Sequence, residues 1–279
     1  MLPHWTEHDI VVDGIKTHYT RTGAGEKPPL MLLHGFSDHG LCWLPVVRDL
    51  EADWDIILPD ARGHGKSERV QVDGTYDHPA DIAALIGALG LVKPVVGGHS
   101  MGAATASTLE ARFPGLVKAL VLEDPPWREW APPPVPENDK VAQKTPPPNP
   151  WWDWLSKLPG TPVEEIIARG KAENPNWPEI EWQPWAESKL QLDTNIFKAQ
   201  GARLAWLEVV KAIQVPTLLL TGDPSKGAIV SPEIAGEVAA LSAAIRVVNI
   251  PGVGHSIRRE NYPRFIQAVT AFLEDFKGN

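Results

Sequence analysis

The sequence predicts an α/β fold in which a mostly parallel central sheet carries helices on both faces. Short runs rich in Val, Ile and Leu recur along the chain, which is typical of strands buried on both sides. Segments with helix signals separate these runs, as repeated βα units require. One proline- and tryptophan-rich region interrupts the pattern and indicates an insertion. The expected strands are 30–34, 55–60, 94–98, 117–124, 216–222 and 245–250.

The chain opens with a stretch that predicts a β-hairpin ahead of the parallel sheet. Polar and apolar residues alternate over 6–23 around Asp13-Gly14, a dipeptide that favours a tight turn. Further along, residues 78–90 predict a helix, because Pro79 suits its first turn and Gly90 its end. The alanine-rich segment 103–113 predicts another helix, which ends before Pro114.

The insertion follows the strand at 117–124, the sixth strand of the predicted sheet. Eight of the 12 tryptophans fall between Trp127 and Trp185, beside proline runs that can continue neither helix nor central strand. We therefore expect a core domain of residues 1–124 and 213–279 and a cap formed by residues 125–212. Within the cap, 162–174 and 184–194 predict short helices with charged outer faces.

Composition limits the classes of partner and location. The chain has 279 residues and a net charge of −9, and an acidic surface disfavours nucleic acid. Cys42 is the single cysteine, so an internal disulfide is impossible. No apolar run reaches the roughly 20 residues of a membrane helix, and the first residues lack the pattern of a secretory signal. We expect a soluble protein of a reducing compartment, most simply the cytoplasm, without nucleic-acid or membrane partners.

One pentapeptide carries most of the chemical information. Gly98-His99-Ser100-Met101-Gly102 lies between an expected strand and an expected helix, which is the setting in which G-x-S-x-G has a mechanical meaning. The glycines permit a crowded turn that raises the serine hydroxyl above the sheet. The helix N-terminus then places free amides and a favourable dipole beside developing negative charge.

With this motif the chain resembles the α/β-hydrolase superfamily over most of its length outside the cap. Four motifs in the expected order support the resemblance: residues 32–36, 59–67, 98–102 and 252–256. The layout is similar to the capped small-molecule branch, which includes esterases, lactonases and carbon–carbon bond hydrolases. Relatives that use an aspartate nucleophile are disfavoured, because this position holds Ser100.

A serine hydroxyl needs a base, and His255 is the leading candidate because it follows the strand at 245–250 in a glycine-flanked loop. Two positions for the orienting acid remain open. The resemblance allows an acid after the strand at 117–124, where Asp124 stands, or after the strand at 216–222, where Asp223 stands. We prefer Asp124 and keep Asp223 as the alternative. Glu123 is a lesser candidate, since alternation along a strand turns it away from Asp124.

The resemblance also implies an oxyanion hole made by the backbone amides of Phe36 and Met101. The aromatic cap indicates a hydrophobic substrate, and we expect Trp127 and Trp130 to contact it, because they directly follow the Asp124 strand. Packing of the cap onto the core is an equally good explanation of the indoles. No sequence motif for a metal, nucleotide or dinucleotide is present, so no cofactor is expected.

These features predict a cofactor-independent serine hydrolase that cleaves a small hydrophobic or aromatic ester or lactone through an acyl-enzyme on Ser100. Water is the second substrate. Two alternatives stay open: hydrolysis of carbon–carbon or amide bonds by the same triad, and a non-catalytic small-molecule receptor on the same fold. The sequence leaves the oligomeric state undetermined.

Overall fold

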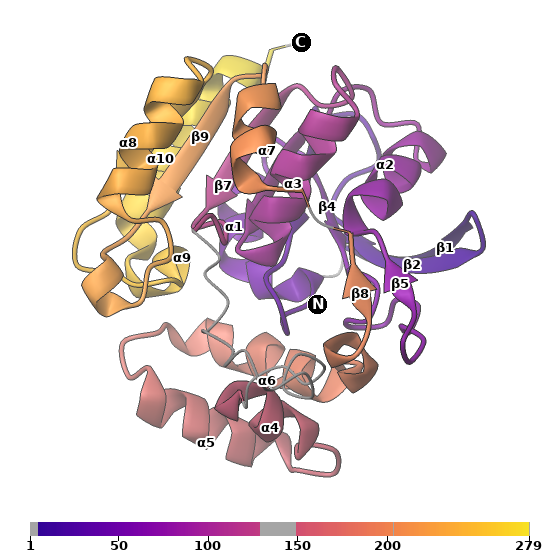
Figure 1. The fold of residues 1–279 in the computed structure, drawn as a ribbon. Coiled ribbons are helices and arrows are strands. Elements are labelled where there is room, and N and C mark those ends of the chain that lie inside the picture. Colours follow the sequence, from indigo (N-terminus) through magenta and orange to yellow (C-terminus); the bar gives the residue numbers. More distant parts are fainter. Residues whose placement is uncertain (1–4, 129–148, 203, 279) are drawn as a thin grey trace, which may run out of the picture.

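The computed structural model describes residues 5–128, 149–202 and 204–278. Eight strands of the described residues form one twisted sheet in the order β1-β2-β4-β3-β6-β7-β9-β10, parallel from β4 onward (Figure 1). The predicted α/β fold is thus confirmed. The strands are β1 (Thr6–Val12), β2 (Ile15–Arg21), β3 (Pro29–Leu33), β4 (Asp55–Pro59), β6 (Val95–His99), β7 (Ala119–Glu123), β9 (Thr217–Thr221) and β10 (Ile245–Asn249).

The predicted hairpin is also confirmed. β1 and β2 pair antiparallel with Val12 opposite Ile15, so the turn falls on Asp13-Gly14. β2 continues antiparallel onto β4, which joins the hairpin to the parallel part of the sheet. A further small sheet, in which Thr75–Tyr76 (β5) pairs with Gln200–Gly201 (β8), was not predicted.

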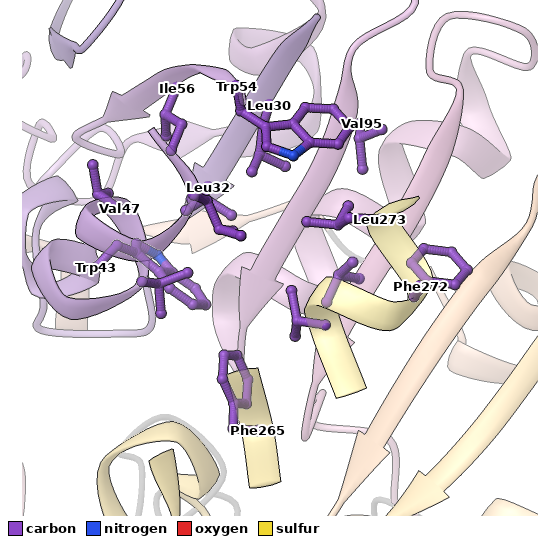
Figure 2. Close-up of a cluster of buried hydrophobic side chains, with 14 of the residues drawn as sticks. Leu30, Leu32, Trp43, Val47, Trp54, Ile56, Val95, Phe265, Phe272 and Leu273 are labelled. Atoms are coloured by element: carbon purple, nitrogen blue, oxygen red, sulfur yellow. The ribbon is translucent and has the colours of Figure 1, made fainter. Parts of the chain in front are cut away.

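Helices cover both faces of the sheet, and alternation along each buried strand supplies both contacts. Leu30 and Leu32 of β3 belong to one hydrophobic cluster, whereas Met31 and Leu33 belong to the other. The first cluster packs against α1 and α10, and Figure 2 shows Phe265 of α10 among its members. The second packs against α2, α3, α7 and α8. These helices are α1 (Leu44–Leu50), α2 (His78–Ala88), α3 (Met101–Arg112), α7 (Trp206–Ala212), α8 (Pro232–Leu241) and α10 (Tyr262–Leu273).

Residues 149–197, the main described part of the predicted cap, lie across one end of the sheet domain, as the salmon helices of Figure 1 show. Its side chains Leu155, Trp182 and Trp185 belong to a third hydrophobic cluster, which also includes Val70 of the sheet domain. The predicted helices at 162–174 and 184–194 are found as α5 and α6. The cap elements are α4 (Pro150–Ser156), α5 (Val163–Glu173), η3 (Glu179–Glu181), α6 (Trp182–Gln191) and η4 (Thr194–Phe197).

Two details of the cap differ from the expectation. Helix α7 falls inside the range 125–212, but Val209 and Val210 are buried in the cluster of the sheet domain, because its apolar side packs on α3. The side chains of α6 are not all turned outward either. Lys189 is only 3% exposed, since it has a buried carboxylate as partner.

The remaining short elements connect these layers. Three of them adjoin the site described below: η1 precedes α1, η5 follows β9, and α9 follows the His255 loop. Their bounds, with that of the C-terminal turn, are η1 (Gly40–Trp43), η5 (Pro224–Lys226), α9 (Ile257–Glu260) and η6 (Glu274–Phe276). No helix of the described residues is both long and apolar enough to span a membrane.

Candidate active site

Ser100 stands in a strained turn between β6 and α3. Its backbone has φ 51° and ψ −113°, a region that costs a non-glycine residue about 1–3 kcal/mol. The turn is crowded enough to require both motif glycines. A Cβ on Gly98 would lie 2.3 Å from the carbonyl carbon of Gly102, and a Cβ on Gly102 would lie 2.2 Å from the carbonyl oxygen of Leu33. The G-x-S-x-G spacing is therefore what this backbone path demands.

His255 is held by Asp124, which follows β7, the strand next to β6 in the sheet. The ring Nδ1 lies 2.6 Å from Asp124 Oδ2, and the Asp124 carboxylate is fully buried. The same carboxylate accepts hydrogen bonds from the backbone amides of Ile229 (2.8 Å, to Oδ2) and Val230 (3.0 Å, to Oδ1). Three donors thus fix the acid, and the acid fixes the orientation of the imidazole.

Asp223 and Glu123, the other two candidates for the acid, are engaged elsewhere. Asp223 accepts a hydrogen bond from the amide of Gly252 at 2.6 Å, which stabilises the turn before the His255 loop. Glu123 accepts from Arg258, with Oε2 3.0 Å from the guanidinium. The opposite orientation of Glu123 and Asp124 follows the alternation expected along a strand.

Three more histidines surround these groups. His99 packs on the ring of His255 with centroids 4.6 Å apart, and its Nε2 lies 3.0 Å from the carbonyl oxygen of His255. Burial lowers the pKa of His99 well below its ordinary value, so the ring is neutral and acts as the donor in that contact. Nε2 of His34 accepts from the amide of Ala61 at 2.9 Å. His64 lies under Phe36 in an edge-on contact.

The predicted oxyanion amides occupy the ends of two adjacent strands. Met101 is the first residue of α3, so its amide belongs to the free N-terminus of that helix. Phe36 follows β3, which pairs with β6 in the sheet. Because β3 and β6 are parallel and adjacent, the residues that follow them lie at the same end of the sheet. Both amides therefore belong to the end of the sheet where Ser100 stands.

A cavity of about 320 Å³ lies beneath the cap and reaches both Ser100 and His255. Its wall combines aromatic and polar side chains, so it is less apolar than the cap composition predicted. Phe36 lines it, as expected. The remaining members of the wall are Ser37, Asp38, His99, Trp151, Glu173, Asn174, Trp177, Trp185, Lys189, Ser256 and Arg259.

Trp127, one of the two tryptophans predicted to contact substrate, is not among these residues. Trp127 is 2% exposed and stacks on Trp206 at 6.3 Å, within the cluster under α3 and α7. Trp130 lies outside the described residues. Sequence reasoning anticipated indoles in the wall of the cavity, but the choice of Trp127 was wrong, since position along the chain does not give distance in the fold.

Metal ligands do not assemble in the described part of the chain: no three of its His, Cys, Asp or Glu side chains are grouped to hold an ion.

The alpha/beta hydrolase fold model matches residues 28–262. The chain therefore belongs to the α/β-hydrolase family and is a hydrolase of that family. It is 24% identical to a 2-(acetamidomethylene)succinate hydrolase of Mesorhizobium japonicum, over 97% of this chain and 96% of that protein.

Two solved structures extend the comparison. A thermophilic esterase from Thermogutta terrifontis has a TM-score of 0.71 and 25% identity, covering 97% of this chain and 98% of the esterase. The enol-lactonase from Burkholderia xenovorans LB400 has a TM-score of 0.70 and 22% identity, covering 96% of this chain and 100% of the lactonase.

Proposed function

We propose that this protein is a serine hydrolase that cleaves a carboxylic ester or lactone of a small molecule through an acyl-enzyme on Ser100. The observation that carries the proposal is the 2.6 Å contact between His255 Nδ1 and Asp124 Oδ2, beside a cavity that Ser100 and His255 both line. A buried carboxylate in that contact keeps the proton on Nδ1. Nε2 is then left free to accept the proton of Ser100.

Each step of the proposed reaction uses one of the groups described above. Oγ of Ser100 attacks the substrate carbonyl while His255 takes its proton, and the amides of Phe36 and Met101 stabilise the resulting oxyanion, each by about 3 kcal/mol. The carbonyl re-forms as the leaving oxygen departs with the proton from His255. Water, deprotonated by His255, then attacks the acyl-enzyme and releases the acid and free Ser100.

The cavity favours a small substrate with an aromatic or otherwise flat part. Trp177 and Trp185 form part of the wall, and aromatic side chains contribute large apolar contact areas. Its volume of about 320 Å³ lies at the lower end of the range for small-molecule sites.

The test is release of p-nitrophenol from acetate, butyrate and octanoate esters, with Ser100→Ala as the matched blank. We expect turnover by the parent protein, none by the variant, and a preference for the shorter chains. Intact mass of a rapidly quenched reaction should show one acyl group on the parent protein and none on Ser100→Ala. Turnover that survives in Ser100→Ala would overturn the proposal.

Cleavage of a carbon–nitrogen bond is the second candidate, because the full-length relative is named for an acetamido-bearing succinate. The same steps apply with nitrogen as the leaving atom. A matched pair, p-nitrophenyl acetate and p-nitroacetanilide, separates the two: ester cleavage alone supports the first candidate, and comparable kcat/KM for both supports the second. Binding without turnover or acylation would instead favour a receptor.

A further inference from the structure

Six charged side chains form a buried charge cluster between the cap and the sheet domain. Each is 3% exposed or less, although charged residues are almost never buried unless they are paired. Three acids balance three bases in formal charge. The members are Asp38, Glu123, Glu181, Lys189, Arg258 and Arg259.

Asp38 is the centre of this cluster. Its Oδ1 accepts from Lys189 Nζ at 2.8 Å, and its Oδ2 accepts from Arg259 at 3.0 Å and lies 3.5 Å from Arg258. Burial alone would raise the pKa of Asp38, but the surrounding cations hold it well below the ordinary value. Each arginine continues to a second acid, Arg258 to Glu123 at 3.0 Å and Arg259 to Glu181 at 2.9 Å.

Four members of the cluster lie close in sequence to groups of the proposed mechanism. Asp38 follows Phe36 by two residues, and its amide donates to the carbonyl of Gly35 at 3.1 Å. Glu123 immediately precedes Asp124. Arg258 and Arg259 lie in α9, directly after the His255 loop.

The other two members reach the cap. Lys189 belongs to α6 and Glu181 to η3, and both of these elements are part of the predicted cap. The Nζ of Lys189 also donates to the carbonyl of Ser37 at 2.9 Å, which fixes the loop after β3 a second time.

We propose that Asp38 is a positioning residue, whose carboxylate holds the Phe36 loop, the His255 loop and the cap in one arrangement. The inference rests on the proposed function, since it concerns the placement of that site. Buried ion pairs give little net stability because desolvation offsets their attraction, but they define geometry where partners from distant segments must meet. An error of about 1 Å in such placement can cost roughly 100-fold in rate.

The experiment uses a fluorophosphonate probe, which reports activation of Ser100 without any assumption about the natural substrate. Ser100 Oγ attacks phosphorus, fluoride leaves, and His255 accepts the serine proton. We expect Asp38→Asn to label roughly 100-fold more slowly than the parent protein, measured by intact mass at a temperature where both are folded. With an ester substrate, the loss should fall on kcat more than on KM.

Asp55→Asn is the matched control. Asp55 is a 1% exposed carboxylate paired with Arg21 at 2.5 Å. It begins β4, whereas Ser100 follows the end of the parallel strand β6, so the two residues lie at opposite ends of the parallel strands. It should lower the unfolding temperature and leave the labelling rate of the folded protein unchanged.

A second variant separates the effect of Asp38 on the placement of the catalytic groups from its effect on the stability of the fold. Asp38→Asn together with Lys189→Met leaves two acids and two bases in the cluster, which restores its charge balance. We expect the unfolding temperature to recover while labelling stays slow. This double variant also carries the test if Asp38→Asn alone does not fold.

Labelling that recovers together with stability, or parental labelling by folded Asp38→Asn, would overturn the positioning role. A parent protein that labels but turns over no ester contradicts the proposed function only. A parent protein that fails to label contradicts both.

Discussion

Replacing Asp124 by Asn tests the proposed acid most directly. The carboxylate receives three donors: His255 Nδ1 and the Ile229 amide reach Oδ2, and the Val230 amide reaches Oδ1. An asparagine has one acceptor oxygen and one NH2 group, so one of its two orientations must be chosen. Either choice sets the NH2 against at least one buried donor.

The two orientations have different consequences for the imidazole. With the oxygen at the Oδ2 position, His255 keeps its tautomer, but the NH2 opposes the amide of Val230. With the NH2 at that position, it opposes the amide of Ile229 and forces the His255 proton onto Nε2. The base can then no longer accept a proton from Ser100.

Both outcomes remove the negative charge that stabilises the imidazolium. The general catalytic-triad precedent gives a loss of about 10⁴-fold in kcat for an Asp-to-Asn change, and we expect a loss of about 10³- to 10⁴-fold here. The opposed donors should also lower the free energy of unfolding by about 1–3 kcal/mol.

Asp223→Asn is the matched control, because its amide oxygen can still accept from Gly252. Initial rates with a p-nitrophenyl ester across pH 6–9 measure both variants, alongside urea unfolding. We expect Asp223→Asn to keep nearly parental kcat. A larger loss of kcat for Asp223→Asn than for Asp124→Asn would refute the assignment.

Three further predictions concern the framework. Gly102→Ala should abolish activity or folding, because its Cβ would lie 2.2 Å from the Leu33 carbonyl oxygen. Gly87→Ala in α2 has open space around its Cβ and should stabilise the protein by about 0.5–1 kcal/mol. Thermal unfolding compares the two variants with the parent protein. Burial raises the pKa of the Cys42 thiol to about 12, so the native protein should resist iodoacetamide at pH 8 and react once unfolded, as intact mass would show. Burial also lowers the pKa of five histidines, so their side chains bind more protons in the unfolded chain than in the folded one below about pH 6.5. Each histidine should remove up to about 1.4 kcal/mol of unfolding free energy per pH unit until its folded pKa is reached. Urea midpoints at pH 7.5, 6 and 5 test this loss, which a constant or rising midpoint would contradict. The five are His34, His39, His64, His78 and His99, and the folded pKa of His78 is about 4.

The fold was predictable because its strands are buried on both faces. Residues 56–59 form an uninterrupted apolar run, and β4 is indeed buried throughout. The small sheet of β5 and β8 was not predictable, since two-residue strands carry no periodicity. The end of the cap was missed for a related reason: the apolar face of α7 fits either domain, and only its packing on α3 decides.

The candidate site was predictable where backbone geometry dictates residue type. Gly98 and Gly102 mark a turn that no larger residue can make, so the motif locates Ser100. The wall of the cavity has no such constraint. Trp177 and Trp127 are both tryptophans of the predicted cap segment, but Trp177 lines the cavity and Trp127 packs in the core.

The buried charge cluster is the feature hardest to derive from the sequence. Lys189 and Asp38 are 151 residues apart, and each taken alone is an ordinary surface residue. Burial of either is tolerable only with the other present, so no local pattern distinguishes them. The sequence does, however, place Glu123 beside Asp124 and Arg258 close after His255. Because adjacent residues on a strand point in opposite directions, a chain that aims Asp124 at the histidine must turn Glu123 the other way, where Arg258 meets it at 3.0 Å. The same two chain segments, 123–124 and 255–258, therefore form both the Asp124–His255 contact and the Glu123–Arg258 ion pair. A shift of either segment must change both contacts.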